Sequence, residues 1–200
     1  AGVIGVDPSP QQIAFARQRH TAGLARFEQG DAMALPIGDA SVDAATMALV
    51  IFFVPEPARG VAEMQRVVRP GGSISAYAWD YLDGGFPWEP VNAELRALGF
   101  APTPPPSPEA GRLANMRELW EAAGLDAVET RVITVERSFP SFEELWATAL
   151  LSPVTAAIFA AMDAPGLAGV KDRVRANVRF EGDTAVLSAR ANAVKGIVRA

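Results

Sequence analysis

Between residues 41 and 80, two long apolar stretches flank a short amphipathic segment, which predicts a strand, a helix and a second strand. The run Ala44–Val54 is apolar almost throughout, as expected for a strand that is covered on both faces. A helix is expected to begin at Pro57, because the first helical residue needs no N–H. Its buried stripe would consist of four residues at helical spacing: Val61, Met64, Val67 and Val68.

The end of this helix is predicted at Pro70-Gly71-Gly72. Proline cannot continue a helix, and glycine adopts turn conformations that other residues avoid. The apolar segment Ser73–Trp79 follows as a second strand. A strand, a crossover helix and a strand together predict a parallel unit with a right-handed connection.

The beginning of the chain predicts another strand, helix and strand. Ala1–Asp7 is an apolar strand that ends in an acid, and Leu24–Gln29 is a short strand followed by the loop Gly30–Pro36. Between the strands, Ser9 is expected to cap a helix, and Gln12 is expected to complete a capping box. Both strands therefore end in loops at the same edge of a parallel sheet.

Beyond residue 80 the sequence predicts mainly helices. Ala101–Pro108 contains five prolines and is expected to be an extended loop. The segment Ala185–Val198 alternates small apolar and polar residues and is expected to be a last strand, antiparallel, at the edge of the sheet. A further strand is expected at Val128–Val135. Two helices are expected to begin at caps: one runs from Asn115 to Gly124, and the other begins at Ser141. The other expected helices are Val91–Leu98, Pro153–Met162, which is apolar nearly all round, and a helix that is lined by Val170, Val174 and Val178 and ends at about Phe180.

Composition restricts the class of protein. The 200 residues are 50% hydrophobic, which is enough for one sizeable core, and one domain is expected. With 18 basic and 23 acidic residues the net charge is −5, which argues against nucleic acid as a partner. The sequence has no cysteine, no spanning apolar segment and no leader pattern, so a cytoplasmic location without a membrane span is expected.

No catalytic or metal-binding constellation is recognisable. The single histidine, His20, falls at a predicted helix end, where a structural role is favoured over general-base catalysis. The serines have no recognisable histidine partner, and the acidic residues are scattered. The sequence therefore argues against a hydrolase and against a metal site.

Several motifs nevertheless carry a family resemblance. Asp43–Val54, Pro55-Glu56-Pro57 and Glu63–Gly72 stand in the order of the fourth strand, the following helix and the next turn of class I S-adenosylmethionine-dependent methyltransferases. The chain is most similar to the small-molecule group that includes the ubiquinone/menaquinone-biosynthesis type. The resemblance implies an α/β fold with a Rossmann-like, doubly wound mixed sheet. It also implies a single domain, with a cofactor-binding part (1–80), a largely helical substrate-side and later-sheet part (81–183) and a terminal strand (184–200).

The resemblance implies a binding site for S-adenosylmethionine. Asp7, followed by Pro8, matches the acid that binds the ribose hydroxyls, and Asp31 matches the acid near the adenine amino group. A carboxylate accepts hydrogen bonds only, which suits a diol or an amino group. Asp7 could instead cap a helix, and Asp31 could merely shape a turn. Other implied contacts are Ala32 and Met33 beside the adenine, and Ala48 and Leu49 at the end of the fourth strand, for which core packing is an equal alternative.

The resemblance also implies a small-molecule methyl acceptor. Phe52-Phe53 stand where many relatives have two histidines, which favours an acceptor with an apolar part. Trp79, Tyr81 and Trp88 are candidates to line its pocket, although aromatic residues more often pack in a core. No catalytic residue is assigned, because methyl transfer from a sulfonium depends mainly on alignment and a dry cavity.

The family's first strand and its Gly-rich cofactor loop would precede Ala1, and no G-x-G-x-G occurs in the sequence. We therefore expect the sequence to be N-terminally truncated, and we expect residues 1–200 alone to bind the cofactor weakly. Two alternatives stay open. One is a nicotinamide-binding Rossmann oxidoreductase, in which a strand-end acid also binds ribose. The other is a non-catalytic remnant or interaction protein that has lost cofactor binding.

Overall fold

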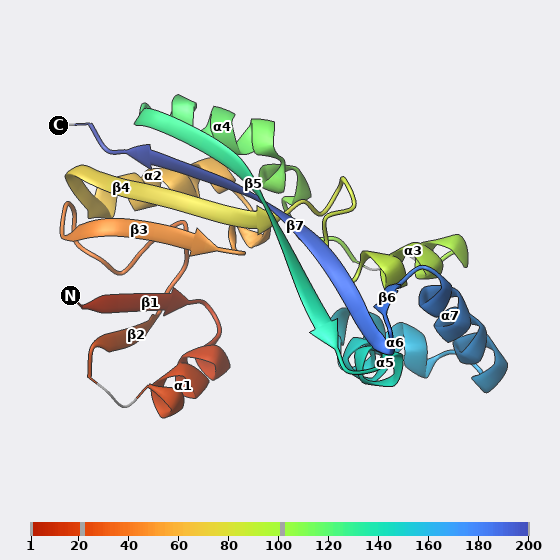
Figure 1. Cartoon of the computed structure of the whole chain (residues 1–200). Helices are drawn as coiled ribbons and strands as arrows, with labels where there is room; N and C mark the ends of the chain where they lie inside the picture. Colours follow the sequence, from red (N-terminus) through yellow and green to blue (C-terminus); the bar gives the residue numbers. More distant parts are fainter. Residues whose placement is uncertain (1, 21–22, 101–102, 200) are drawn as a thin grey trace. The chain divides into compact units, whose positions relative to one another are not determined.

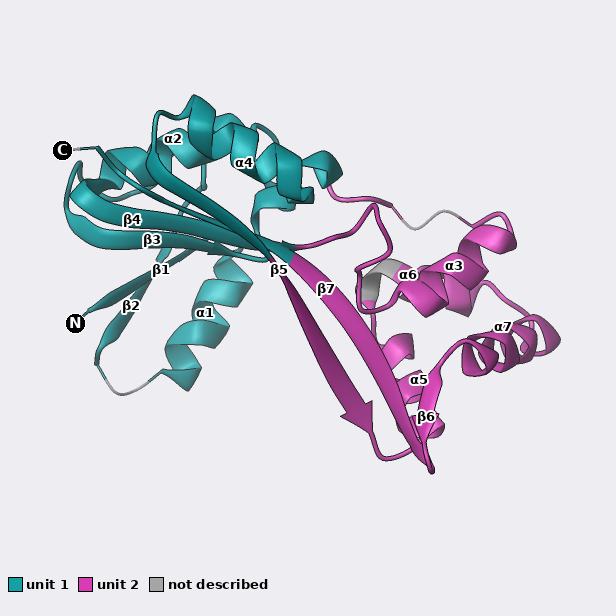
Figure 2. Ribbon diagram, turned by 45° about the horizontal axis from the view of Figure 1, so that its top comes forward, with its two compact units in different colours: residues 1–78, 106–131, 192–200 teal, residues 79–105, 132–191 magenta. Residues whose placement is uncertain are grey.

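A computed structural model of the chain describes residues 2–20, 23–100 and 103–199. The chain forms two compact units, coloured separately in Figure 2. Unit 1 consists of residues 1–78, 106–131 and 192–200, and unit 2 consists of residues 79–105 and 132–191.

The beginning of unit 1 has the predicted strand, helix and strand. β1 (Val3–Asp7) and β2 (Ala25–Gln29) pair in parallel, with Asp7 opposite Gln29, and α1 (Pro10–Arg19) connects them. Because the two strands run in the same direction, their final residues and the loops that follow lie at one edge (Figure 1).

The cap of α1 differs in one detail from the prediction. Oγ of Ser9 accepts a hydrogen bond from the backbone N–H of Gln12 at 3.3 Å, as predicted for a helix cap. The backbone N–H of Ser9 donates to Oδ1 of Asp7 at 2.8 Å and not to Gln12. The predicted capping box is therefore wrong in its second half, because an acid at the end of β1 takes that donor.

The apolar run of residues 44–54 is not one strand, which corrects the prediction. β3 (Val42–Ala48) ends where Leu49 takes a positive φ of 59°, and η1 (Ile51–Phe53) is a short 3-10 helix. Along β3, Met47 is buried, whereas the alternate residues Thr46 and Ala48 are exposed. Among the described residues, β3 is therefore covered on one face only.

After η1, helix α2 (Pro57–Val67) begins at the predicted proline and buries Val61, Met64 and Val67. β4 (Val68–Trp79) begins at once, so the predicted stop of the helix at Pro70-Gly71-Gly72 is wrong. β3 and β4 pair in parallel, but the register shifts between Val42 and Ala44. The Pro-Gly-Gly residues therefore form an irregularity at the start of β4, where Gly71 has a φ of 78°.

The strands form two sheets. β1 and β2 make one, and the other has five strands in the order β3-β4-β7-β5, with β6 (Arg179–Glu181) paired to β7. β7 (Thr184–Ile197) lies between β4 and β5 (Asp126–Phe139), so its predicted place at the edge is wrong.

The predicted antiparallel direction of the last strand is confirmed. Gly71 N–H donates to Val198 O, and Val198 N–H donates to Gly72 O, both at 2.9 Å, which joins the start of β4 to the end of β7. With the parallel pair β3 and β4, the sheet is mixed, and the predicted α/β fold is confirmed.

The remaining helical elements of unit 1 are η2 (Pro108–Gly111) and α4 (Leu113–Ala122). The N-cap of α4 is Arg112, without a side-chain capping bond, so the predicted cap at Asn115 is wrong; Gly124 follows the helix with a φ of 75°. Trp120 of α4 is fully buried, and its Nε1 donates to the backbone oxygen of Ile74 at 3.2 Å. This bond fixes α4 to β4.

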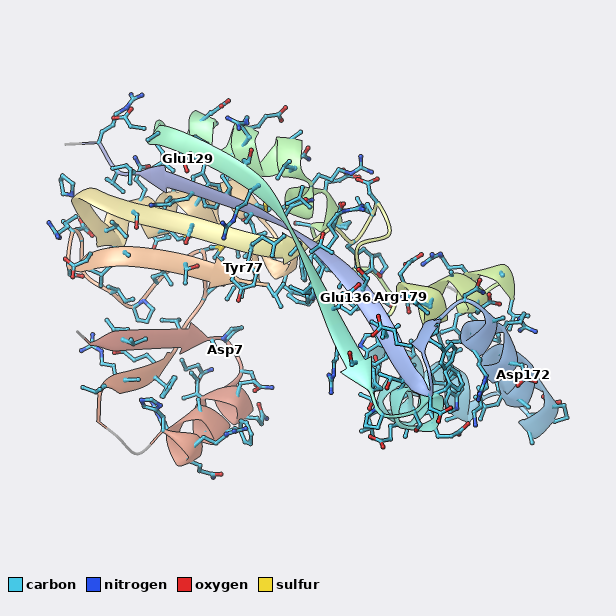
Figure 3. All side chains as sticks on the ribbon, viewed as in Figure 1. Asp7, Tyr77, Glu129, Glu136, Asp172 and Arg179 are labelled. Carbon is cyan, nitrogen blue, oxygen red and sulfur yellow. The ribbon has the colours of Figure 1, made fainter. Side chains whose placement is uncertain are left out.

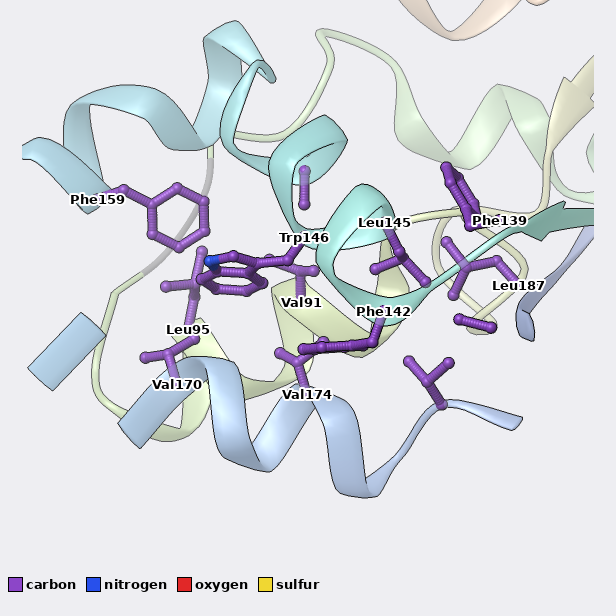
Figure 4. Packing of buried hydrophobic residues seen from close by; sticks show 13 residues of the cluster. Val91, Leu95, Phe139, Phe142, Leu145, Trp146, Phe159, Val170, Val174 and Leu187 are labelled. Atoms are coloured by element: carbon purple, nitrogen blue, oxygen red, sulfur yellow. The ribbon is translucent and has the colours of Figure 1, made fainter. Parts of the chain in front are cut away.

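Unit 2 contains helices around an apolar core, which we call the helical cluster (Figure 4). Ser141 caps its central helix as predicted, since Oγ accepts from the N–H of Glu144 at 3.3 Å. The helices are α3 (Glu89–Ala97), α5 (Phe142–Leu150), α6 (Pro153–Ala160) and α7 (Ala164–Ala176). The helical cluster consists of Val91, Leu95, Phe139, Phe142, Leu145, Trp146, Ala149, Phe159, Val170, Val174, Val178, Ala185 and Leu187.

One helix prediction in unit 2 needs correction. α7 ends at Ala176, and Phe180 belongs to β6 instead. The predicted apolar helix α6 is present; it buries Phe159 and exposes Ala157 and Ala160.

Candidate functional site

The final residues of β1 and β2 bring together two of the predicted cofactor ligands. The backbone N–H of Gly30 donates to the backbone oxygen of Asp7 at 3.2 Å, and Nε2 of Gln29 donates to the oxygen of Pro8 at 3.2 Å. Asp31 is the next residue along the chain. Both acids therefore lie at the carboxyl ends of parallel strands, where ligands bind in open α/β sheets.

Asp7 is half-buried at the tip of β1 (Figure 3). Its Oδ1 accepts the hydrogen bond from Ser9 N–H, which holds the carboxylate at the start of α1. An ionised carboxylate has two oxygens that each accept more than one hydrogen bond, so this bond leaves acceptor capacity for a ligand. The capping and the ligand-binding interpretations of Asp7 are thus compatible.

Asp31 shapes the loop that follows β2. Its Oδ1 accepts from Met33 N–H at 2.8 Å, and its backbone oxygen accepts from Ala34 N–H at 3.0 Å. The side chain is exposed. The turn-shaping role is therefore present, and the second carboxylate oxygen is the one that could reach a ligand.

A pocket of about 950 Å³ lies in unit 1 and is lined by residues from both sheets. Every residue from Val42 to Met47 lines it, so the edge of β3 borders the pocket, and β1 contributes residues from the opposite side. Within the described residues, β3 pairs only with β4 and β1 only with β2, so two unpaired strand edges flank the pocket. Such edges present backbone hydrogen-bond donors and acceptors to a ligand that enters the pocket.

The pocket includes only some of the predicted cofactor ligands. Asp7, Pro8 and Ala32 line it, together with Gly30. Asp31, Met33, Ala48 and Leu49 are not among its lining residues. Its volume is within the range of roughly 300–1,000 Å³ that is usual for small-molecule sites.

At the end of β3, Ala48 is exposed and Leu49 is half-buried. The backbone N–H of Leu49 donates to the oxygen of Tyr77 at 2.8 Å, which ties the positive-φ turn to β4. Exposure of Ala48 argues against the core-packing alternative for that residue.

The predicted substrate residues are divided between the units. Phe52 belongs to unit 1, is buried, lies 4.6 Å from the ring of Phe53 and does not line the pocket. Trp79, Tyr81 and Trp88 belong to unit 2. Phe52 therefore has the environment of a core residue within its own unit.

Within unit 2, Tyr81 packs edge-on against Phe86 with ring centroids 5.3 Å apart, and burial raises the pKa of the Tyr81 hydroxyl. Trp88 packs against the helical cluster, 6.4 Å from the ring of Phe139. The loop that carries Tyr81 is fixed by Asp80, whose Oδ2 accepts from Nη2 of Arg190 at 2.6 Å.

The described residues contain no cluster of histidine, cysteine and acidic side chains that could hold a metal ion. A search of the same residues finds no helix that is long and apolar enough to cross a membrane.

Two side chains of α2 contact the loop after β2, and the sequence does not predict this contact. Glu63 and Arg66 lie within the motif Glu63–Gly72, and both form hydrogen bonds with the backbone of Leu35. Their spacing predicts a helical ion pair, but no sequence signal connects them to a loop some thirty residues earlier.

Comparison with known proteins shows which family the first part of the chain resembles. A family model described as "Methyltransferase domain" matches residues 1–76. A demethylmenaquinone methyltransferase from Deinococcus radiodurans is 43% identical over 74 residues, which cover 36% of this chain and 31% of that protein. The chain spans only 28% of the length of the first curated relatives that it matches.

Solved structures resemble the chain over a much larger part of its length. The YcgJ protein from Bacillus subtilis has a TM-score of 0.59 at 18% identity, covering 100% of this chain and 83% of that one. A phosphoethanolamine N-methyltransferase from Haemonchus contortus in complex with S-adenosyl-L-methionine has a TM-score of 0.55 at 15% identity, covering 98% of this chain and 43% of that one. At these identities the likeness shows the fold, which is Rossmann-like.

Proposed function

We propose that this chain, a member of the class I S-adenosylmethionine-dependent methyltransferases, transfers a methyl group from that cofactor to a small molecule with an apolar part. The observation that carries the proposal is the position of Asp7. Asp7 ends β1 and is among the residues that line a pocket of about 950 Å³, and its carboxylate keeps acceptor capacity beyond its bond to Ser9.

The ribose of the cofactor is assigned to Asp7, with Pro8 beside it. Two vicinal hydroxyls donate well to one carboxylate, and hydrogen bonds to a charged acceptor are the stronger kind. The bond from Ser9 N–H holds the carboxylate in place before the ligand arrives, so little side-chain entropy is lost on binding.

The adenine is assigned to the loop after β2. Asp31 would accept from the amino group, while Ala32 and Met33 would lie beside the ring. Oδ1 of Asp31 accepts a hydrogen bond from Met33 N–H. The conformation of the loop therefore determines where the other carboxylate oxygen, which would accept from the adenine amino group, lies. Ala48 and Leu49, at the end of β3, are assigned to the methionine side of the cofactor.

When bound, S-adenosylmethionine supplies an electrophilic methyl group. The protein then has to align the acceptor and exclude water. For this role we propose Trp79, Tyr81 and Trp88 of unit 2, whose apolar surfaces suit an acceptor with an apolar part. The relative named demethylmenaquinone methyltransferase supports this class of acceptor. Phe52 is buried in unit 1 and does not line the pocket, so we assign it to core packing.

Binding of a panel of cofactors to the full-length protein tests the proposal. S-adenosylhomocysteine at 100 times its dissociation constant would stabilise the folded protein by about 2.7 kcal/mol, which a thermal-shift assay detects. We expect this stabilisation with S-adenosylhomocysteine and none with NAD⁺ or NADP⁺. Stabilisation by a nicotinamide cofactor alone would favour the oxidoreductase, and no response to any cofactor would favour the remnant.

A further inference from the structure

The loop after β2 is closed at its base. A Cβ atom on Gly30 would lie 2.7 Å from Cδ of Pro36 and 2.9 Å from Cγ1 of Val6, so the two ends of the loop are in close contact. Inside it, the two hydrogen bonds accepted by Asp31 fix the turn. We call residues 30–36 the adenine loop, after the role proposed above.

Two side chains of α2 hold this loop from outside. Oε2 of Glu63 accepts from the backbone N–H of Leu35 at 2.7 Å, and Nη2 of Arg66 donates to the backbone oxygen of Leu35 at 3.1 Å. Both backbone polar groups of one residue are therefore bound by side chains from a helix 28 and 31 positions further along the chain.

Arg66 uses the full geometry of its guanidinium group. Nε and Nη2 bind the two oxygens of Glu63 at 2.7 Å each, and Nη1 donates to Ile37 O at 2.9 Å and to Asp39 Oδ1 at 2.6 Å. With the bond to Leu35, each of the five N–H groups that a guanidinium carries has an acceptor. Lysine has three donors on one nitrogen and could not reproduce this planar fork.

The charges of the pair are maintained by the same contacts. The hydrogen bond from Arg66 lowers the pKa of the Glu63 carboxyl, and the bond to Glu63 raises the pKa of the Arg66 guanidinium. The side chains are 19% and 32% exposed, which is less than for a typical surface pair.

A second pair, formed by the N-cap residue and the first turn of the same helix, has the same spacing but a different environment. Nη1 of Arg59 donates to Oε1 of Glu56 at 2.7 Å, and both side chains are more than half exposed. No hydrogen bond from this pair to residues 30–36 is found among the described residues. Its charge and helical spacing match those of Glu63 and Arg66, which makes it an internal control.

We propose that Glu63 and Arg66 are positioning residues that set the selectivity of the cofactor site for adenine, by fixing Leu35 and with it the adenine loop. This inference rests on the proposed function. Leu35 lies four residues after Asp31, and the bond from Ala34 N–H to Asp31 O transmits its position to the acid. The ribose contact at Asp7 belongs to β1, which is bonded to the adenine loop at Gly30 and not at Leu35.

The test compares two ligands with the full-length protein by calorimetry. S-adenosylhomocysteine carries the adenine amino group, whereas S-inosylhomocysteine carries at the same position a carbonyl, which accepts hydrogen bonds and cannot donate to Asp31. We expect Arg66→Lys to weaken S-adenosylhomocysteine binding about tenfold, as expected for one charge-assisted hydrogen bond, and to leave S-inosylhomocysteine binding nearly unchanged. The ratio of the two affinities would therefore fall about tenfold.

The control Arg59→Lys is expected to leave that ratio unchanged. Glu63→Leu is the second variant if Arg66→Lys fails to fold, because it keeps a side chain of similar size but removes the acceptor for Leu35 N–H; it is also expected to lower the ratio. An unchanged ratio in a folded Arg66→Lys or Glu63→Leu protein would overturn the positioning role and leave the proposed function intact. Failure of the unmodified protein to bind S-adenosylhomocysteine would overturn both.

Discussion

Unit 1 and unit 2 differ in what fixes their loops and helices. In unit 1, the adenine loop is held by side-chain bonds to backbone atoms, from Glu63 and Arg66 to Leu35. In unit 2, the helices are held mainly by the thirteen apolar residues of the helical cluster. The family match at residues 1–76 falls within the first segment of unit 1, residues 1–78.

This difference suits two different binding tasks. Hydrogen bonds are directional, so bonds to backbone atoms hold a loop in one conformation. This suits the binding of a cofactor that is the same molecule in every reaction cycle. Apolar cores tolerate volume-conserving substitutions, so a unit built on them can change its surface while keeping its fold. We infer that the adenine loop in unit 1 is specified by polar anchors and that the helices of unit 2 are specified by packing.

The largest effects are expected from removing one core tryptophan in each unit. Trp146→Ala should destabilise unit 2 by about 3–5 kcal/mol, because the side chain is buried beside Phe142 and Phe159. Trp120→Ala should cost unit 1 at least as much, because it also leaves the oxygen of Ile74 without its donor.

Urea unfolding followed by hydrogen exchange in each unit measures both changes. Trp146→Phe, which keeps most of the apolar contact, is the control. Affinity for S-adenosylhomocysteine should persist in Trp146→Ala wherever unit 1 remains folded. Loss of binding under those conditions would contradict the assignment of the cofactor to unit 1.

A smaller effect is expected at the start of β4. A Cβ atom on Gly72 would lie 2.5 Å from the backbone oxygen of Asp43 and 2.9 Å from that of Arg69. Gly72→Ala should therefore destabilise unit 1 by about 1–3 kcal/mol through overpacking. Gly38→Ala, where the nearest atom is Oγ of Ser41 at 3.9 Å, should change stability by less than about 0.5 kcal/mol. Equal denaturation midpoints for Gly72→Ala and Gly38→Ala would contradict this expectation, because they would show that the irregular start of β4 accommodates the added methyl group.

The smallest effect concerns pH and the anchor of the adenine loop. The pKa of Glu63 is lowered in the folded protein from the ordinary 4.5, chiefly by the hydrogen bond from Arg66. Its contribution to stability is therefore present above pH 4.5 and is lost as the pH falls through the lower, folded value.

The stability difference between the unmodified protein and Glu63→Gln, about 1 kcal/mol or less for a partly exposed pair, should shrink between neutral and acidic pH. Glu56→Gln, at the exposed pair, is the control. A difference that grows on acidification would mean that Glu63 is not held ionised by Arg66.

Much of unit 1 could be predicted from local signals. The cap at Ser9, the proline that begins α2 and the apolar spacing of Val61, Met64 and Val67 each have a local cause. These elements place Asp7 at a strand end and Asp31 in the following loop, whereas their assignment to a cofactor depends on the family resemblance.

The remaining features depend on contacts between distant segments. The end of β3 is set by a positive φ at Leu49, a residue that gives no turn signal. The internal place of β7 depends on pairing with strands that lie far away in the sequence. The anchor at Leu35 depends on Glu63 and Arg66, whose local spacing predicts only a helical pair.

The central claim is that Asp7 binds the ribose of the cofactor, and calorimetry on Asp7→Asn tests it most directly. Asparagine keeps an oxygen that can accept from Ser9 N–H and so preserves the helix cap, but it lacks the charge. The charge-matched control is Asp126→Asn in the same unit, where the acid pairs with Arg199. We predict that Asp7→Asn weakens S-adenosylhomocysteine binding about tenfold or more while Asp126→Asn does not. Equal affinities for the two folded variants would contradict the account.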